Sequence, residues 1–243
     1  MPTPFNLMRT GLLAACAILS ASVMSAADKF EGRIEMTITD SHTPDKSLPI
    51  QYAIKGNKIR FDLPTDPKRN KNAGTAATLI DLDKHELIML IDSGAQGKLA
   101  MRHPLKEQTQ ATGNSATQTP VATGKSDKIA GYSADEYKMT DEKGLVHDLW
   151  LGKGLGTFYS ANQGGVGRRT NVSPAWEAFA REKGFFPLRV VSHDKNGKET
   201  TRMEVTKVDK TSLPDSLFST EGYQEMQIPS FNGKSLMEGL APR

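Results

Sequence analysis

Residues 30–63 read FEGRIEMTITDSHTPDKSLPIQYAIKGNKIRFDL. Over residues 30–38, apolar side chains and one glycine occupy every second position, and charged residues or threonines lie between them. A spacing of two places the apolar side chains on one face of a β-strand. The alternation resumes on both sides of Gly56-Asn57, a dipeptide typical of a tight turn. The stretch therefore predicts a strand followed by a β-hairpin, each with one buried face.

The same pattern extends through most of the chain. Two denser apolar runs, residues 78–82 and 87–91, predict central strands that are covered on both faces, because they lack a polar face. Alternation predicts further strands over residues 98–102, 128–139, 145–151, 185–192 and 198–208. The last two strands flank Asn196-Gly197, which favours a hairpin.

One segment has helical rather than strand spacing. Ser173 is suited to the N-cap and Pro174 to the first helical position, and Trp176, Phe179 and Ala180 then share one face of a helix. The predicted fold class is therefore mainly β (α+β), a meandering antiparallel sheet with one short amphipathic helix packed against it.

The first residues have the layout of an export signal. Arg9 supplies a positive charge, residues 11–26 are small, apolar or serine, and the first acidic residue is Asp28. This order predicts a signal peptide over residues 1–27, cut near Ala27, and hence a periplasmic or secreted protein.

Cys16 offers a competing interpretation. Leu13-Ala14-Ala15-Cys16 fits a bacterial lipobox, in which the cysteine is acylated. The apolar segment before Cys16 is short, and the residues after it stay apolar instead of forming a polar tether, so cleavage near Ala27 is favoured. Since Cys16 is the only cysteine, such cleavage leaves a chain without disulfides, whose stability comes from its core.

Net charge and hydropathy argue against two classes of protein, those that bind nucleic acids and those with transmembrane helices. The net charge of the 243 residues is +3 and falls to +2 without Arg9, and the basic residues are scattered among acidic ones. This pattern predicts no nucleic-acid partner. No later segment approaches ~18 consecutive apolar residues, so we expect no transmembrane helix in the mature chain.

Residues 28–229 are expected to form a single domain, followed by a tail over residues 230–243.

Residues 107–126 interrupt the strand pattern. The segment has no aromatic residue and a single β-branched aliphatic residue, Val121. Because so little apolar area is available for burial, we expect a mobile loop inserted between strands of one sheet.

The search for catalytic and metal-binding motifs predicts no catalytic residue, no metal site and no cofactor. The five histidines are widely spaced, and neither a zinc-binding HExxH motif nor a Gly-x-Ser-x-Gly elbow is present. The densest titratable cluster is Asp81, Asp83, His85 and Glu86, whose oxygens and nitrogen suit a cation, although turns favour the same residues.

Two basic segments have loop-like composition. They are Lys68, Arg69 and Lys71, and the pair Arg168-Arg169. They suit anionic lipid headgroups or an acidic partner, and they also suit a solvated loop that aids solubility.

Several blocks of sequence resemble a known family. These blocks are Lys128-Ile129-Ala130-Gly131-Tyr132 with Glu136-Tyr137, Leu149-Trp150-Leu151, Gly184-Phe185-Phe186-Pro187-Leu188-Arg189-Val190-Val191, and Leu213-Pro214 with Leu217-Phe218 and Gly222-Tyr223. In residue identity and spacing, from about Phe30 to Tyr223, the chain resembles an exported bacterial domain-of-unknown-function family, DUF4412. Members of that family are similar to the lipoprotein-carrier and lipid-carrier (LolA-like) β-clam proteins of the cell envelope.

The resemblance implies an incomplete β-barrel, a curled antiparallel sheet around an apolar hollow, with the helix at its open face. It carries over no catalytic residue, since the family has none assigned. Family members often have a cysteine where this chain has Ala134, so a role based on that thiol does not apply here.

Alternation along the strands and the helix predicts which side chains face such a hollow. We name this set the apolar wall: Phe30, Ile34, Met36, Phe61, Met89, Trp176 and Phe179. One interpretation is that the wall binds a lipid or an acyl chain, because methionine adapts to irregular apolar ligands. The other is that these residues pack on one another as an ordinary core.

Two functional hypotheses follow. The first is a non-enzymatic periplasmic protein that holds a lipid or another apolar ligand between sheet and helix. The alternative is a structural or interaction module of the envelope that contacts a protein partner through its sheet edges, its basic loops or its tail. An enzyme that depends on Asp81, Asp83 and His85 is a distant third.

Overall fold

The computed structural model describes residues 30–43, 47–63, 75–94, 97–105, 119–160 and 175–227. In this part of the chain, twelve strands form one sheet. The strands are β1 (Glu31–Asp40), β2 (Leu48–Lys55), β3 (Lys58–Leu63), β4 (Thr75–Asp81), β5 (Glu86–Asp92), β6 (Lys98–Pro104), β7 (Val121–Ile129), β8 (Tyr132–Thr140), β9 (Val146–Gly152), β10 (Phe186–His193), β11 (Glu199–Lys210) and β12 (Gln224–Gln227). The helical elements are α1 (Ala175–Glu182) and the short 3-10 helix η3 (Asp215–Phe218).

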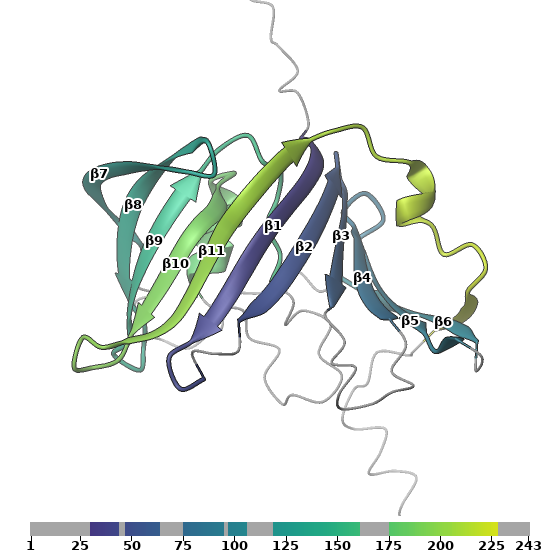
Figure 1. Ribbon diagram of the computed structural model, residues 1–243, viewed down its shortest axis with the longest axis horizontal. Coiled ribbons are helices and arrows are strands. Elements are labelled where there is room, and N and C mark those ends of the chain that lie inside the picture. Colours follow the sequence, from purple (N-terminus) through teal and green to yellow (C-terminus); the bar gives the residue numbers. More distant parts are fainter. Residues whose placement is uncertain are drawn as a thin grey trace, which may run out of the picture.

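The sheet consists of two meanders that meet in its middle. Strands β1 to β6 pair in chain order, and so do β7 to β11, giving the spatial order β12-β6-β5-β4-β3-β2-β1-β11-β10-β9-β8-β7. Every pair is antiparallel except β12 with β6. Figure 1 shows that the sheet curls but stays open, with β7 and β6 at opposite ends.

Pairing between β1 and β11 joins the two meanders. The ladder runs from Gly32 opposite Lys210 to Asp40 opposite Thr201, with a bulge between Glu35 and Met36. Gly32 is buried, and a Cβ atom at this position would collide with the backbone carbonyl oxygen of Asp209. Glycine is therefore required at this position of the β1–β11 pair.

The main core lies on the inner face of the curled sheet. Both meanders contribute, because the alternating inward side chains of β1, β3, β9 and β10 converge there. Fully buried members include Ile34 and Met36 of β1, Phe61 of β3, Leu149 of β9 and Phe186 of β10.

A second, smaller cluster lies on the outer face of β4, β5 and β6. It contains Ala77, Leu79, Ile88, Leu90 and Ala100, and Tyr223 packs against it. We call this set the outer cluster. Residues 78–80 and 87–88 are consequently buried whichever face they point to, which confirms the predicted central strands covered on both faces.

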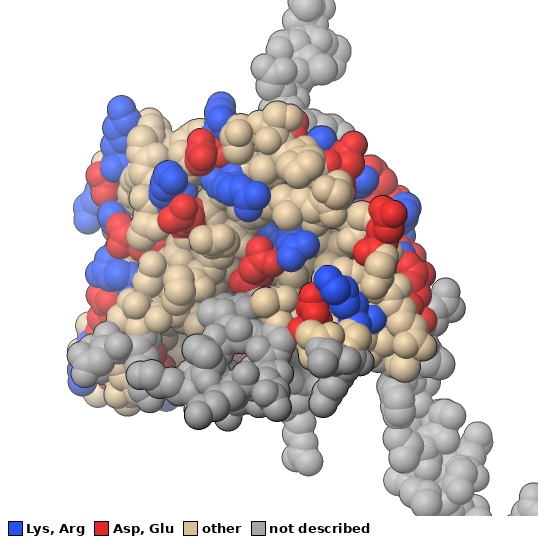
Figure 2. All heavy atoms as spheres, turned by 45° about the vertical axis from the view of Figure 1, so that its right-hand side comes forward, with Lys and Arg blue, Asp and Glu red and all other residues tan. Residues whose placement is uncertain are grey.

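The segment that covers this outer face is residues 211–223, which we call the strap. It leaves the end of β11, crosses the outer side of the sheet through η3, and leads into β12 beside β6 (Figure 1). Figure 2 brings this side forward and shows acidic and basic side chains interspersed over it.

The predicted fold class is confirmed. The described residues are mainly β, and they form an open, curled sheet with α1 on its inner face. The alternation over residues 30–38, 145–151 and 198–208 corresponds to β1, β9 and β11 to within a few residues. The expected N-cap Ser173 and Pro174 lie outside the described residues.

Two sequence predictions were wrong in detail. Residues 121–126 belong to β7 rather than to a loop, and residues 107–118 lie outside the described part. All side chains of β7 before Ile129 are exposed, so this edge strand is held by backbone pairing to β8 and has no apolar face to detect. The strand predicted over residues 128–139 is divided by a turn in which Ala130 and Gly131 both have positive φ.

Within the described residues, no helix is both long and apolar enough to cross a membrane.

Replacing Gly32 with alanine is expected to lower the free energy of unfolding by about 3 kcal/mol, because the added methyl group must push β1 away from β11. Urea denaturation followed by tryptophan fluorescence measures the change. Arg33→Ala is the matched control, since its side chain is exposed on the same strand. A Gly32→Ala protein as stable as Arg33→Ala would contradict the close approach of the two strands.

Candidate functional site

The structure brings the predicted apolar wall together. Phe30 precedes β1, which carries Ile34 and Met36, and β3 and β5 contribute one residue each. Phe30, Ile34, Met36, Phe61 and Trp176 are buried members of the main core, and Met89 and Phe179 are partly buried against it. Side chains from distant parts of the sequence thus form one apolar surface between sheet and helix.

Aromatic rings occupy the centre of this surface. Tyr52 contacts Phe61, with 5.4 Å between ring centroids, and Phe158, at 5.9 Å. Phe158 also stacks on Trp176 at 5.9 Å and meets the edge of Phe186 at 5.5 Å. Such pairs add to the stability that burial alone provides.

The predicted wall omitted Phe158 and Phe186, although both are fully buried. Phe186 alternates with Leu188 and Val190 along β10, so the strand pattern contains the signal. Phe158 lies outside any strand, in a segment that leaves β9 through Gly154 and Gly156, both with positive φ. These glycines permit the backbone turns by which the chain leaves the strand.

A buried polar pair fixes α1 to this segment. The Glu177 side chain is fully buried, and Arg181 Nη1 donates to its Oε1 at 2.7 Å. The backbone N–H of Ser160 donates to the same oxygen at 3.1 Å, and the Arg181 guanidinium lies 5.0 Å from the ring centroid of Tyr159. The Glu177–Arg181 ion pair and the Ser160 hydrogen bond therefore fix one face of the helix to this segment, while Trp176 and Ala180 are buried in the core.

Tyr52 supplies a second polar link across the inner face. Its hydroxyl donates to the backbone carbonyl of Tyr159 at 2.9 Å. Burial raises the pKa of Tyr52 far above its ordinary value, and the charge of Glu177 acts in the same direction. The phenol therefore stays neutral and acts as a hydrogen-bond donor.

The helix lies over only one end of the inner face. Phe179 contacts Tyr137 of β8 at 5.6 Å and Phe185, which precedes β10, at 6.2 Å. Figure 1 places α1 behind β10 and β11, away from β4 to β6. At that other end, Leu82, Met89 and Leu105 are only partly buried against the core.

The polar cluster at residues 81–86 is a turn whose side chains have separate partners. Asp81 Oδ1 accepts the backbone N–H groups of Asp83 and Lys84 at 3.1 Å. Asp83 Oδ1 accepts from Asn57 at 2.6 Å, and Glu86 pairs with Arg102 at 2.9 Å. Across the described residues, no three His, Cys, Asp or Glu side chains are grouped as metal ligands.

Both histidines between β9 and β10 have polar neighbours. His147 is buried, with Nδ1 2.9 Å from Ser192 Oγ and Nε2 3.6 Å from Asp141 Oδ2. His193 Nε2 lies 3.0 Å from Asp148. Burial opposes ionisation of Asp148, but hydrogen bonds from Lys138 and His193 lower its pKa below the ordinary value. Both ring nitrogens of His147 therefore face polar side chains within the fold.

Both predicted basic segments, Lys68 to Lys71 and Arg168-Arg169, lie outside the described residues, as does the C-terminal tail over residues 230–243.

The chain matches the model of a known protein family. The model of the family described as "Domain of unknown function (DUF4412)" matches residues 30–222. The resemblance expected from the sequence blocks is thereby confirmed. No curated protein matches the chain.

Several solved structures are similar to the chain at low identity. A structure of PNGF-II is 17% identical over 86% of this chain, with a TM-score of 0.48, and the chain spans about a third (33%) of its length. An uncharacterized conserved protein from Thermus thermophilus is 11% identical, with 82% of this chain and 91% of that one covered and a TM-score of 0.45. A LolA superfamily protein from Nitrosomonas europaea is 14% identical, with 80% and 91% covered and a TM-score of 0.31.

Replacing Arg181 with methionine is expected to destabilise the protein by about 3 kcal/mol, because the buried carboxylate of Glu177 loses its ion pair with Arg181. The double variant Glu177→Gln/Arg181→Met should recover much of this loss, since an amide tolerates burial better than a carboxylate. Urea denaturation curves of the two variants measure the difference.

Lys183→Met is the matched control at the end of the same helix, because its pair with Glu182 is exposed and should contribute little. Equal effects for Arg181→Met and Lys183→Met would contradict a buried clamp between α1 and Ser160.

Proposed function

The chain belongs to the DUF4412 family, and on that premise we propose that it is a non-enzymatic binding protein that holds a lipid or another apolar ligand between its sheet and α1. The observation that carries the proposal is the apolar wall. Its seven residues come from β1, β3, β5, α1 and the residue before β1, and all of them belong to or pack against one cluster on the inner face.

Partial coverage of this surface supports a ligand rather than a closed core. Since α1 packs over the β8–β10 end, the partly buried Leu82, Met89 and Leu105 provide apolar contact area at the other end. Methionine adapts its conformation to irregular apolar groups, and Met89 is the middle residue of β5.

The chemistry of the wall favours an acyl chain over a polar ligand. Binding would depend on the burial of hydrocarbon, at roughly 25 cal/mol for each Å² removed from water. The polar groups near the wall already have partners, since Tyr52 donates to Tyr159 and Arg181 pairs with Glu177. A ligand with buried polar groups would therefore find few unused hydrogen-bonding partners there.

Export gives such a protein its place of action. The layout of residues 1–27 favours cleavage near Ala27 and a periplasmic or secreted location, where an apolar ligand such as a lipid has to cross water between membranes.

The alternative function, an interaction module of the envelope, has one observation in its favour. Strand β7 is an edge strand with all side chains exposed up to Lys128, and the exposed fraction of Val121 is 68%. Its outer backbone groups suit pairing with a strand of a protein partner. The bulge between Ala122 and Ser126 interrupts that edge and leaves only short regular stretches for a partner.

We expect the protein purified natively from its own host to carry a lipid or fatty acid, detected by mass spectrometry of an organic extract. Met89→Lys should reduce the ratio of lipid to protein at least fivefold, because an ammonium group on the inner face opposes burial of an acyl chain. Met226→Lys is the matched control, since Met226 is 49% exposed on β12. A lipid-free wild-type protein would contradict the carrier and favour the interaction module.

The intact mass of the same sample tests the location. We expect the mass of a chain that has lost residues 1–27. A chain that begins at Cys16 and carries acyl groups would instead establish a membrane-anchored lipoprotein.

A further inference from the structure

Three methionines lie side by side at the end of the sheet formed by β5, β6 and β12. Met89 of β5 is the cross-strand partner of Met101 of β6, and Met101 is in turn the partner of Met226 of β12. Partners in a ladder carry their side chains on the same face of a sheet. The three thioethers therefore form one row across neighbouring strands, which we call the methionine row.

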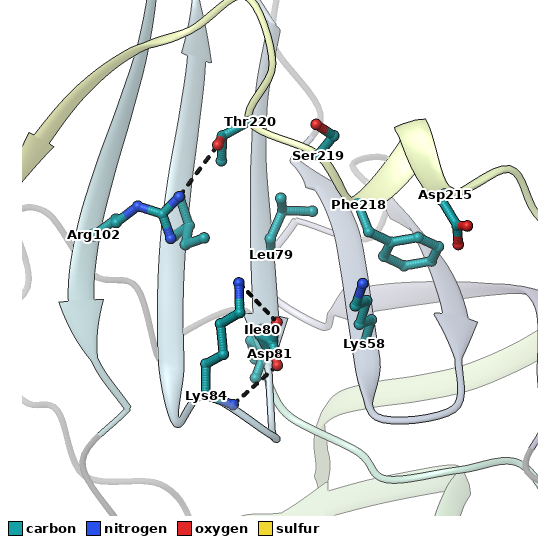
Figure 3. A pocket seen from close by; sticks show the side chains of 11 residues that line it. Lys58, Leu79, Ile80, Asp81, Lys84, Arg102, Asp215, Phe218, Ser219 and Thr220 are labelled. Carbon is teal, nitrogen blue, oxygen red and sulfur yellow. Dashed lines mark hydrogen bonds and ion pairs between the residues drawn. The ribbon is translucent and has the colours of Figure 1, made fainter.

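The first two members of the row face the inner side of the sheet. Met89 packs against the main core, whereas Leu90, the next residue of β5, belongs to the outer cluster. Arg102, the residue after Met101, points to the outer side, where its Nη2 donates to the hydroxyl of Thr220 in the strap at 3.2 Å (Figure 3). Alternation along β6 then places Met101 on the inner face, beside Met89.

Met226 faces the same side and is open to solvent. Glu225, the preceding residue of β12, contacts Arg102 on the outer side, with 2.6 Å between Oε1 and Nη2. Alternation therefore directs Met226 inward, where 49% of its surface is exposed. Met89 and Met101 are partly exposed. The row is thus accessible from water at the β12 edge.

The spacing of the strands lets the three sulfur atoms meet. Neighbouring strands are about 4.8 Å apart, and a methionine side chain has three rotatable bonds. Met89 and Met226 each lie one strand away from Met101, so their thioethers can lean toward the middle strand. Three sulfur atoms then reach a single ion above Met101.

A histidine lies on the same face, two residues from the middle methionine. His103 shares the inner side of β6 with Met101, and its partner across the ladder is Leu87, a member of the main core. The ring of His103 forms no hydrogen bond or ion pair with any described residue. Its imidazole is therefore available as a fourth ligand.

This group of ligands is soft and uncharged. The other inward side chains of β5 and β6 are those of Leu87, Ile91 and Leu99, so no carboxylate of these two strands faces the row. Mg²⁺ and Ca²⁺ require oxygen ligands, which the row does not offer. Thioethers favour monovalent copper, and imidazole also suits copper.

We propose that the methionine row and His103 bind one Cu⁺ ion on the inner face, at the β12 edge of the sheet. The aligned thioethers account for the choice of a soft ion, and the unpartnered imidazole completes the coordination. This site does not rest on the proposed lipid carrier, with which it shares only Met89.

Transfer of Cu⁺ from the chelator bathocuproine disulfonate to the full mature protein, under nitrogen, tests the site. We expect the protein to withdraw one equivalent of Cu⁺. In methyl NMR spectra, the signals of Met89, Met101 and Met226 should shift when Cu⁺ is added. Those of Met36 and Met139, which are buried in the main core, should stay in place.

Met226→Leu should weaken Cu⁺ binding about tenfold, because leucine retains the apolar volume but lacks the sulfur atom. Met101→Leu and His103→Leu should have effects in the same direction. Met203→Leu is the matched control, since Met203 is a partly buried residue of β11 whose cross-strand neighbours are not methionines.

Three results would overturn the proposal: no withdrawal of Cu⁺ from the chelator, wild-type affinity in both Met101→Leu and Met226→Leu, or an equal loss of affinity in Met203→Leu. The ratio of co-purifying lipid to protein, measured for the same variants, separates this site from the carrier. A Met226→Leu protein that loses Cu⁺ and retains its lipid would support both sites. Binding of Cu⁺ by a lipid-free wild-type protein would contradict the carrier and leave the copper site standing.

Discussion

The antiparallel ladder between β1 and β11 is the contact on which the rest of the molecule depends. Each meander is a row of hairpins with one apolar face, and neither row alone encloses a core. Pairing β1 with β11 makes the two rows into one sheet and brings Ile34, Phe61 and Phe186 into one cluster. The glycine at position 32 permits this approach, because any side chain there would meet the backbone of β11.

The segments that pack on the two faces of the sheet are fixed by different kinds of interaction. On the inner face, α1 and the segment after β9 are fixed by aromatic packing around Phe158 and by the buried pair of Glu177 and Arg181. On the outer face, the strap is fixed by charged side chains of β1, β2, β3 and β6, which contact it at both ends and at η3. Burial dominates the first contact and charge-assisted hydrogen bonds the second.

The sequence predicted those parts of the structure in which local pattern and burial coincide. Alternation placed Ile34, Met36 and Phe61 on a buried face, and the dense runs around Leu79 and Ile88 predicted strands covered twice. The same reasoning missed residues 121–126, because an exposed edge strand is specified by its neighbour and not by an apolar period. The position of the strap could not be predicted from local pattern, because its partners lie more than 150 residues earlier in the chain. Leu213 contacts Glu31 and Lys55, and Leu217 contacts Arg60, at separations of 182, 158 and 157 residues. Among the aromatic residues of the inner-face core, the sequence reasoning missed Phe158, which lies outside any periodic element, and Phe186, whose strand pattern does contain the signal.

The central ladder also sets the order in which the molecule can fold. Thr206 on β11 donates to the carbonyl of Glu35 on β1, and these two residues are 171 positions apart. During synthesis, β1 to β6 are complete long before the strand that joins them to the second meander exists. Hairpins can form early, but the core must wait for the last long strand, so contact order is high and folding is slow. Before β11 is available, a chain of this topology has no complete core. It therefore stays unfolded enough to pass through a narrow channel until nearly all of it has been transported.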